Sequence, residues 1–164
     1  MKNLTQNLLL IFALIISADF SAKAQKGSDV IRQVSCYDST LKSQADSLKL
    51  VLYKQGFVVV REATMTMESE YEMPVIVPLS EGSWYHIAFI GDKSSKLYEI
   101  RMYDQDEKQV VYQKKYAEGY ESGNIINYSY IPKFSEYHMI KPVQVSKKKK
   151  TSLCGYFIIF KKVK

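Results

Sequence analysis

The amino-acid sequence predicts an antiparallel β-sandwich of the jelly-roll type, with about eight strands and one helix packed on it near the N-terminus. Two observations predict this fold. From residue 57 onward, short runs of β-branched and aromatic residues are separated by turn-forming Gly, Asp, Ser and Pro residues. Helical spacing of apolar residues is found in a single stretch that precedes these runs.

The first 24 residues are expected to be a secretory signal peptide that is removed before Gln25. Lys2 lies near the start, residues 8–16 form a short apolar run, and Ala22-Lys23-Ala24 matches the pattern of small residues at a cleavage site. A membrane span needs about 20 apolar residues, so an uncleaved anchor is the less favoured alternative. The sequence therefore predicts an exported protein of the periplasm or cell surface that does not span a membrane.

Residues 25–56 are predicted to form an N-terminal extension and the helix, before a sandwich over residues 57–164. Within 38–55, apolar residues recur at helical spacing: Leu41, Ala45, Leu48 and Leu52. Asp38 or Ser39 is suited to cap the first turn, and Gly56 to end the last one. We expect the apolar face to pack on the sheet. Binding of a partner by this helix is the alternative.

The strands are predicted over residues 57–61 leading into 63–67, and over 73–79, 84–90, 97–103, 109–112, 124–131, 137–145 and 153–160. Pro74 and Pro78 place the second of these strands at a sheet edge, because proline cannot donate to an interior ladder. Two polar turns join the three runs of 84–112, which predicts that they pair as an antiparallel meander. Residues 156–160 are apolar on both faces, so the helix is a natural cover for them.

Cys36 and Cys154 are the two cysteines of the chain. In an exported protein an even number of cysteines favours pairing, so a Cys36–Cys154 disulfide is predicted. Closing so long a loop restricts the unfolded chain by about 4–5 kcal/mol in the entropy model. Two buried thiols that do not meet are the alternative.

A family resemblance is carried by two motifs and a later tyrosine-containing strand. The motifs are Gly82-Ser83-Trp84-Tyr85-x-Ile87 and Tyr98-x-Ile100-x-Met102-Tyr103-Asp104-x-Asp106. In this order they resemble the bacterial pre-peptidase C-terminal type of β-sandwich and, more loosely, small uncharacterised exported sandwich proteins of Gram-negative bacteria. The resemblance covers roughly residues 75–160. Lys108 stands where that pattern often has glycine, the leading helix has no counterpart, and no peptidase is attached. The resemblance implies the fold and an accessory or binding role.

Four residues are candidates for ligand binding: Trp84, His86, Arg101 and Tyr103. Strand alternation places Trp84 and His86 on one face, and pairing within the predicted meander would bring Glu99, Arg101 and Tyr103 to that face as well. Rigid rings with polar tips are suited to stack on sugars. For Trp84 the favoured interpretation is a half-buried position under the helix, and an exposed platform is the alternative. A second aromatic group invites the same two interpretations: Tyr116, Tyr120, Tyr128, Tyr130 and Tyr137.

Two charged stretches are further candidates. Asp104, Asp106 and Glu107 gather carboxylates at one turn, where Ca²⁺ is conceivable because it prefers oxygen ligands; turn formation by the Asp side chains is the favoured interpretation. A run of four lysines, Lys147, Lys148, Lys149 and Lys150, is able to contact an anionic surface, but a solvated turn is the favoured interpretation.

No sequence motif for catalysis or phosphate binding is found, so we expect neither an enzyme nor a cofactor. The formal net charge of +6 is modest, and no nucleic-acid partner is expected. The first interpretation is a non-catalytic exported protein that presents its sandwich surface to another envelope or secreted protein. The alternative is a carbohydrate-binding module with exposed Trp and Tyr rings. Clustered exposed rings would favour a glycan, and an apolar patch or a long free edge strand near 73–79 would favour a protein.

Overall fold

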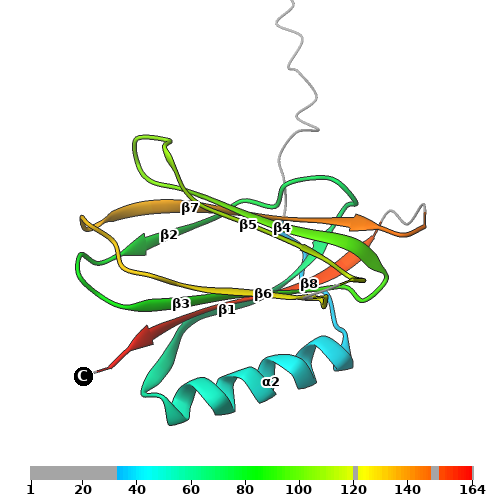
Figure 1. The fold of residues 1–164 in the computed structure, drawn as a ribbon, viewed down its shortest axis with the longest axis horizontal. Coiled ribbons are helices and arrows are strands. Elements are labelled where there is room, and N and C mark those ends of the chain that lie inside the picture. Colours follow the sequence, from blue (N-terminus) through cyan, green and yellow to red (C-terminus); the bar gives the residue numbers. More distant parts are fainter. Residues whose placement is uncertain (1–32, 120–121, 149–151, 164) are drawn as a thin grey trace, which may run out of the picture. The chain divides into compact units, whose positions relative to one another are not determined.

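A computed structural model describes residues 33–119, 122–148 and 152–163. The predicted signal peptide lies outside the described residues. Residues 32–164 form one compact unit, which contains one described helix and two four-stranded antiparallel sheets (Figure 1). The elements are α2 (Ser39–Lys54), β1 (Phe57–Met67), β2 (Val75–Leu79), β3 (Tyr85–Gly91), β4 (Ser95–Tyr103), β5 (Gln109–Tyr116), β6 (Ile125–Tyr130), β7 (Glu136–Ser146) and β8 (Leu153–Lys162).

The strand order is that of a jelly roll. Sheet A has the order β1-β8-β3-β6, and sheet B has the order β2-β7-β4-β5. The first strand pairs with the last, the second with the second last, and so on inward: β1–β8, β2–β7, β3–β6 and β4–β5. Most strands that are neighbours in space are therefore distant in sequence. The predicted fold class, an eight-stranded sandwich with one packed helix, is confirmed. β2 lies at an edge of its sheet, as its prolines predicted.

The predicted three-stranded meander is wrong in one of its two pairings. β4 and β5 pair as a hairpin, but β3 pairs with β6 and β8 in the other sheet. The polar turn after β3 therefore carries the chain between the sheets. It is held there by Tyr98, whose hydroxyl donates to the Asp92 carbonyl at 2.8 Å, and by Gln144, whose Oε1 accepts from the Asp92 N–H at 2.9 Å.

Helix α2 begins and ends where its sequence predicts. The Asp38 carboxylate accepts hydrogen bonds from the N–H groups of Thr40 and Leu41 at 2.8 and 3.1 Å. Gly56, just past the helix, has φ of 80°, a left-handed conformation that favours glycine. Among the described residues no helix has the length and apolar character needed to cross a membrane.

The helix covers the outer face of sheet A (Figure 1). Its buried residues are Leu41, Ala45 and Leu52. They form a cluster with Ala88, Ile90, Ile158 and Phe160 of β3 and β8. The prediction that α2 covers the strand apolar on both faces is confirmed.

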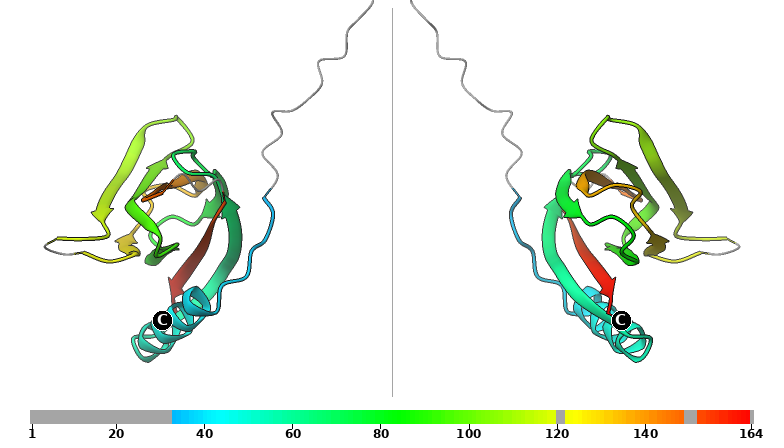
Figure 2. Two further views of the ribbon diagram at one scale, coloured as in Figure 1. Left: turned by 90° about the vertical axis from the view of Figure 1, so that its right-hand side faces the viewer. Right: turned by 90° about the vertical axis from the view of Figure 1, so that its left-hand side faces the viewer.

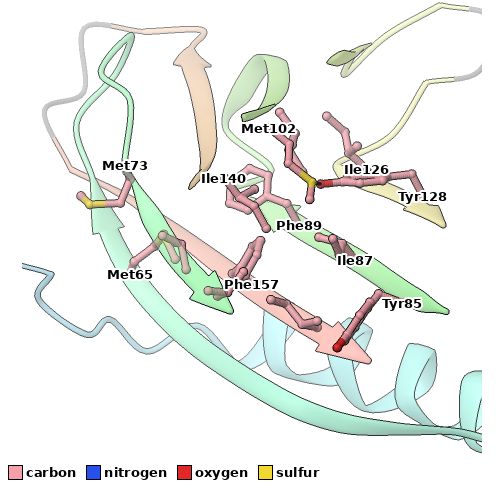
Figure 3. Close-up of a cluster of buried hydrophobic side chains, with 14 of the residues drawn as sticks. Met65, Met73, Tyr85, Ile87, Phe89, Met102, Ile126, Tyr128, Ile140 and Phe157 are labelled. Atoms are coloured by element: carbon pink, nitrogen blue, oxygen red, sulfur yellow. Dashed lines mark hydrogen bonds between the residues drawn. The ribbon is translucent and has the colours of Figure 1, made fainter. Parts of the chain in front are cut away.

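The main core lies between the two sheets (Figure 3). Phe89 and Phe157 from sheet A and Met102 and Ile140 from sheet B are fully buried there. Packing is closest at Gly91, where an added Cβ would lie 2.4 Å from the Tyr98 ring. Burial, followed by the charge of Asp92, raises the pKa of Tyr98 to about 12, so this phenol stays neutral.

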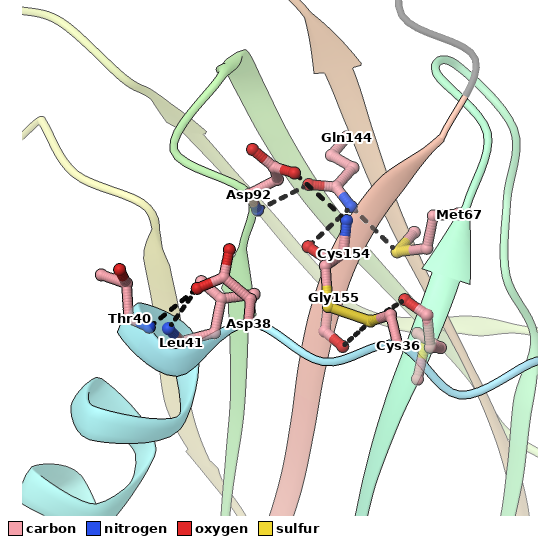
Figure 4. The surroundings of a disulfide bond; sticks show 10 residues. Cys36, Asp38, Thr40, Leu41, Met67, Asp92, Gln144, Cys154 and Gly155 are labelled. Atoms are coloured by element: carbon pink, nitrogen blue, oxygen red, sulfur yellow. Dashed lines mark hydrogen bonds between the residues drawn. A yellow bond between two sulfur atoms is a disulfide. The ribbon is translucent and has the colours of Figure 1, made fainter.

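The predicted disulfide between Cys36 and Cys154 is present, with its Cα atoms 5.8 Å apart (Figure 4). It joins the segment before α2 to β8. The same segment is held by the Thr66 N–H, which donates to the Val34 carbonyl at 2.7 Å. The start of the helix is therefore fixed both covalently and by the backbone of β1.

Candidate functional site: the open face of sheet B

The outer face of sheet B is not covered by any helix that the structure describes (Figure 1). We call this surface the open face. It presents tyrosine rings and charged side chains from three strands and from the segment between β1 and β2. Its principal members are Glu72, Glu99, Arg101, Tyr103, Tyr112, Lys114, Tyr116, Tyr137 and Lys141.

Strand alternation sends these side chains outward. Ile100 and Met102 of β4 point into the core, so Arg101 between them points away from it. The strand register then places Arg101 beside Tyr112 of β5 and Lys141 of β7. Likewise, Glu99 lies opposite Lys114. Residues far apart in the chain thereby meet in rows across the sheet.

Five charged side chains form a continuous chain of ion pairs on this face. Two nitrogens of the Arg101 guanidinium each lie 2.8 Å from a carboxylate, one from Glu99 and one from Glu72. Beyond them, Lys141 lies 2.9 Å from Glu72, and Lys114 lies 3.4 Å from Glu99. Each charge has an opposite neighbour, so the side chains are held in defined positions.

Tyrosine rings flank both ends of this ion-pair chain. The Lys141 ammonium lies 5.2 Å from the centroid of the Tyr103 ring, and the Lys114 ammonium lies 5.4 Å from that of Tyr116. Tyr112 and Tyr116 are 46% and 56% exposed, which leaves their rings accessible to a ligand. The open face therefore combines fixed hydrogen-bonding groups with accessible rings.

Both Arg101 and Lys114 remain charged at neutral pH. The hydrogen bond to Glu99 raises the pKa of Arg101. Contact with the Tyr116 side chain, followed by Glu99, raises the pKa of Lys114. The face thus offers permanent cationic donors beside carboxylate acceptors.

The predicted ligand site is divided between the two outer faces. Arg101 and Tyr103 lie on the open face, whereas Trp84 and His86 lie on the outer side of sheet A. There the rings of Trp84 and His86 lie 5.6 and 6.0 Å from the ring of Phe57. The expectation that the four share one face is wrong because β3 and β4 belong to different sheets. Trp84 is half-exposed, and burial lowers the pKa of His86.

The two charged candidates are engaged in contacts within the chain, local at the Asp104 turn and longer-range at Lys147. Asp104 accepts at Oδ1 from the N–H groups of Asp106 and Lys108, at 3.1 and 2.8 Å, as a turn-forming residue does. Within the described ranges, no group of three or more His, Cys, Asp or Glu side chains is placed to hold a metal ion. This applies also to the predicted group of Asp104, Asp106 and Glu107. Lys147 pairs with Glu118. Lys149 and Lys150 lie outside the described residues.

Sequence reasoning missed most of the ion-pair chain. Glu72 and Lys141 join it through strand pairing between distant segments. For β5 the sequence did contain a local signal. The strand was predicted to end at residue 112, but the alternation of Tyr112, Lys114 and Tyr116 indicates that it continues to residue 116.

Comparison with known proteins places the chain in no family. No family model matches it, and no curated protein matches its sequence. The resemblance to pre-peptidase C-terminal domains therefore stays a prediction.

Distant solved structures share the β-sandwich. A CBM4 structure is 14% identical, over 64% of this chain and 77% of its own, with a TM-score of 0.39. The K3 adhesin domain of Lys-gingipain from Porphyromonas gingivalis W83 is 8% identical, over 61% and 72%, with a TM-score of 0.39. TmCBM61, solved with β-1,4-galactotriose, is 10% identical, over 68% and 84%, with a TM-score of 0.38. At these values the likeness concerns the fold alone.

Proposed function

We propose that this protein is a non-catalytic, exported binding module that holds a glycan on the open face of sheet B. The observation that carries the proposal is the ion-pair chain from Lys114 to Lys141 with a tyrosine ring at each end. A sugar has apolar C–H faces that pack on aromatic rings, and hydroxyl groups that both donate and accept. Fixed carboxylates and cations between the rings match this mixed surface.

The features expected for strand addition by a partner protein are weaker. β2, the edge strand near 73–79, has only five residues and contains Pro78. The carbonyl of Ile76 is already occupied, since it accepts from the Arg61 guanidinium at 2.8 Å. The centre of the open face is charged, unlike the apolar patch that typically marks a protein interface.

One observation keeps a protein partner as the second candidate. Ile131 and Phe134, in the loop between β6 and β7, are 55% and 66% exposed. Exposed apolar side chains on one loop are suited to contact a protein surface. This loop lies at the end of the strands rather than on the open face.

The disulfide supports export. Such bonds persist in oxidising compartments and are rare in the cytosol. The bond between Cys36 and Cys154 would stabilise a module that works outside the inner membrane.

A glycan-array screen of the oxidised protein tests the proposal. Tyr103→Ala and Tyr116→Ala are each expected to weaken selective binding by about tenfold or more, as loss of an anchoring ring does. Tyr53→Ala is the matched control, because Tyr53 is 50% exposed on the helix. If Trp84→Ala alone lost glycan binding, the site would instead lie on sheet A. An array with no binding, from protein whose circular dichroism shows the fold, would overturn the proposal in favour of a protein partner.

A further inference from the structure

A cleft opens between the free edges of the two sheets. β5 is one edge strand of sheet B and β6 is one edge strand of sheet A, and both lie on the same side of the sandwich (Figure 2). The cleft has a volume of about 500 Å³, within the usual range of small-molecule sites. Its lining is mostly polar: Gln113, Lys114, Lys115, Tyr116, Ser122, Ile125, Ile126 and Asn127.

Lys115 is the residue that gives this cleft its charge. Its neighbours Lys114 and Tyr116 point to the open face, so Lys115 points inward, toward sheet A. Its ammonium donates to the Ile125 carbonyl at 3.1 Å and so reaches across from β5 to β6. A lysine ammonium has three donors, and this bond occupies one of them.

The cleft is cationic. Lys115 supplies its charge, since Lys114 at the rim is paired with Glu99, and the lining residues that the structure describes include neither Asp nor Glu. Among the described residues, no carboxylate lies within ion-pair distance of Lys115. Gln113, Ser122 and Asn127 add neutral donors. Such a set favours an anionic group, whose hydrogen bonds to cations are stronger than those between neutral groups.

The cleft is continuous with the open face. Lys114 and Tyr116 belong to both, because β5 forms the rim between them. A glycan that lies across sheet B toward β5 would pass over this rim, and its next sugar unit would enter the cleft.

On the basis of the proposed function, we infer that this cleft holds an acidic sugar unit of the bound glycan, with the anionic group on Lys115. The anionic group is the carboxylate of a uronic acid or the sulfate of a sulfated sugar. The open face then supplies the general affinity for the glycan chain, and the cleft supplies the preference for acidic units.

Paired oligosaccharides that share one sugar backbone and differ in a single kind of charged group test this inference. The first pair is oligogalacturonate and its methyl ester, and the second is a sulfated galacto-oligosaccharide and its unsulfated form. The wild-type protein is expected to bind the acidic member of at least one pair about tenfold more tightly by calorimetry, the value of one charge-assisted hydrogen bond.

Variants locate that preference. Lys115→Gln is expected to remove the roughly tenfold preference, so that the acidic and the neutral member bind with similar affinity. Lys115→Arg should retain the preference because it keeps the charge, and Lys133→Gln in the β6–β7 loop is the charge-matched control. Equal urea midpoints for these variants confirm that the fold is intact.

The outcomes separate the two proposals. Binding of neutral glycans with no acidic preference, or a preference unaffected by Lys115→Gln, overturns the inference and leaves the proposed function standing. Failure to bind any glycan overturns both. A Lys115-dependent preference in the first pair identifies the anionic group as a carboxylate, and in the second as a sulfate.

Discussion

The two outer faces of the sandwich carry different chemistry on the same strand geometry. In sheet A, alternate residues of β3 and β8 present Ala88, Ile90 and Ile158 outward. In sheet B, the equivalent alternation presents Glu99, Arg101 and Lys114. The first face is covered by α2, and the second is open (Figure 1). Strand alternation decides which side chains face outward, but residue type decides whether that face needs a cover.

The energetic reason lies in what each face leaves exposed. The apolar surface of sheet A would cost free energy in water, at about 25 cal/mol per Å², unless the helix covered it. The charges of sheet B are satisfied by one another and by solvent, so the face stays accessible at little cost in stability. The open face is therefore the one available for a ligand.

The largest expected effect comes from placing a charge between α2 and sheet A. Ala45→Asp should lower the free energy of unfolding by about 4 kcal/mol or more, because Ala45 is fully buried in the apolar cluster between α2 and sheet A. Tyr112→Asp on the open face should cost less than about 1 kcal/mol. Urea unfolding measures both.

Ser47→Asp, on the exposed side of the same helix, is the control for a change in helix propensity. Equal losses for Ala45→Asp and Tyr112→Asp would contradict the distinction between a covered and an open face.

The second largest effect is expected from removal of the disulfide, which fixes the segment before α2. Cys36→Ser and Cys154→Ser should each lower the free energy of unfolding by about 2–5 kcal/mol, because both remove the same bond. For the same reason the double variant should be no less stable than either single one. Chemical denaturation with and without a reductant measures this, and reduction of the wild-type protein should reproduce the loss. Additive losses would show that the two cysteines contribute separately.

The smallest effect concerns the rim of the covered face, where Lys49 of α2 pairs with Glu62 of β1. The bond to Lys49 lowers the pKa of Glu62 despite partial burial. A lowered folded pKa means that the contribution to stability is present above the ordinary carboxyl pKa of 4.5 and is lost as the pH falls through the folded value. Glu62→Gln should therefore reduce stability at pH 7, by less than about 1 kcal/mol, because the Glu62 side chain is 42% exposed.

Thermal unfolding at about pH 7 and pH 3 measures this difference, which should shrink in acid. Glu81→Gln, in the loop after β2, is the control for removal of a surface carboxylate. A difference between the wild type and Glu62→Gln that grows on acidification would contradict the assignment.

The fold was largely predictable because its elements depend on local patterns. The helix cap at Asp38, the glycine at position 56 and the apolar residues spaced by four fix α2. The strands follow from alternation and turn residues. The pairing of β3 was not predictable in this way, since a polar turn joins two strands equally well within a sheet or between sheets.

That single pairing explains the error in the candidate site. With β3 beside β4, Trp84 would have joined Arg101, but the jelly-roll order places them on opposite outer faces. Glu72 and Lys141 could not be assigned from local sequence, because only the pairing of β7 with β4 brings Lys141 beside Arg101. The charges were visible in the sequence, but their arrangement was not.

The disulfide has a mechanical consequence. It joins residues 118 positions apart, so a pulling force between residues 33 and 163 passes from Cys36 to Cys154 and then along the rest of β8. The disulfide closes a covalent loop that contains the helix and the other seven strands. The force therefore bypasses these elements, including the strands of the open face. A pulling force between residues 33 and 163 would therefore leave sheet B outside the path of the force for as long as the bond stays oxidised.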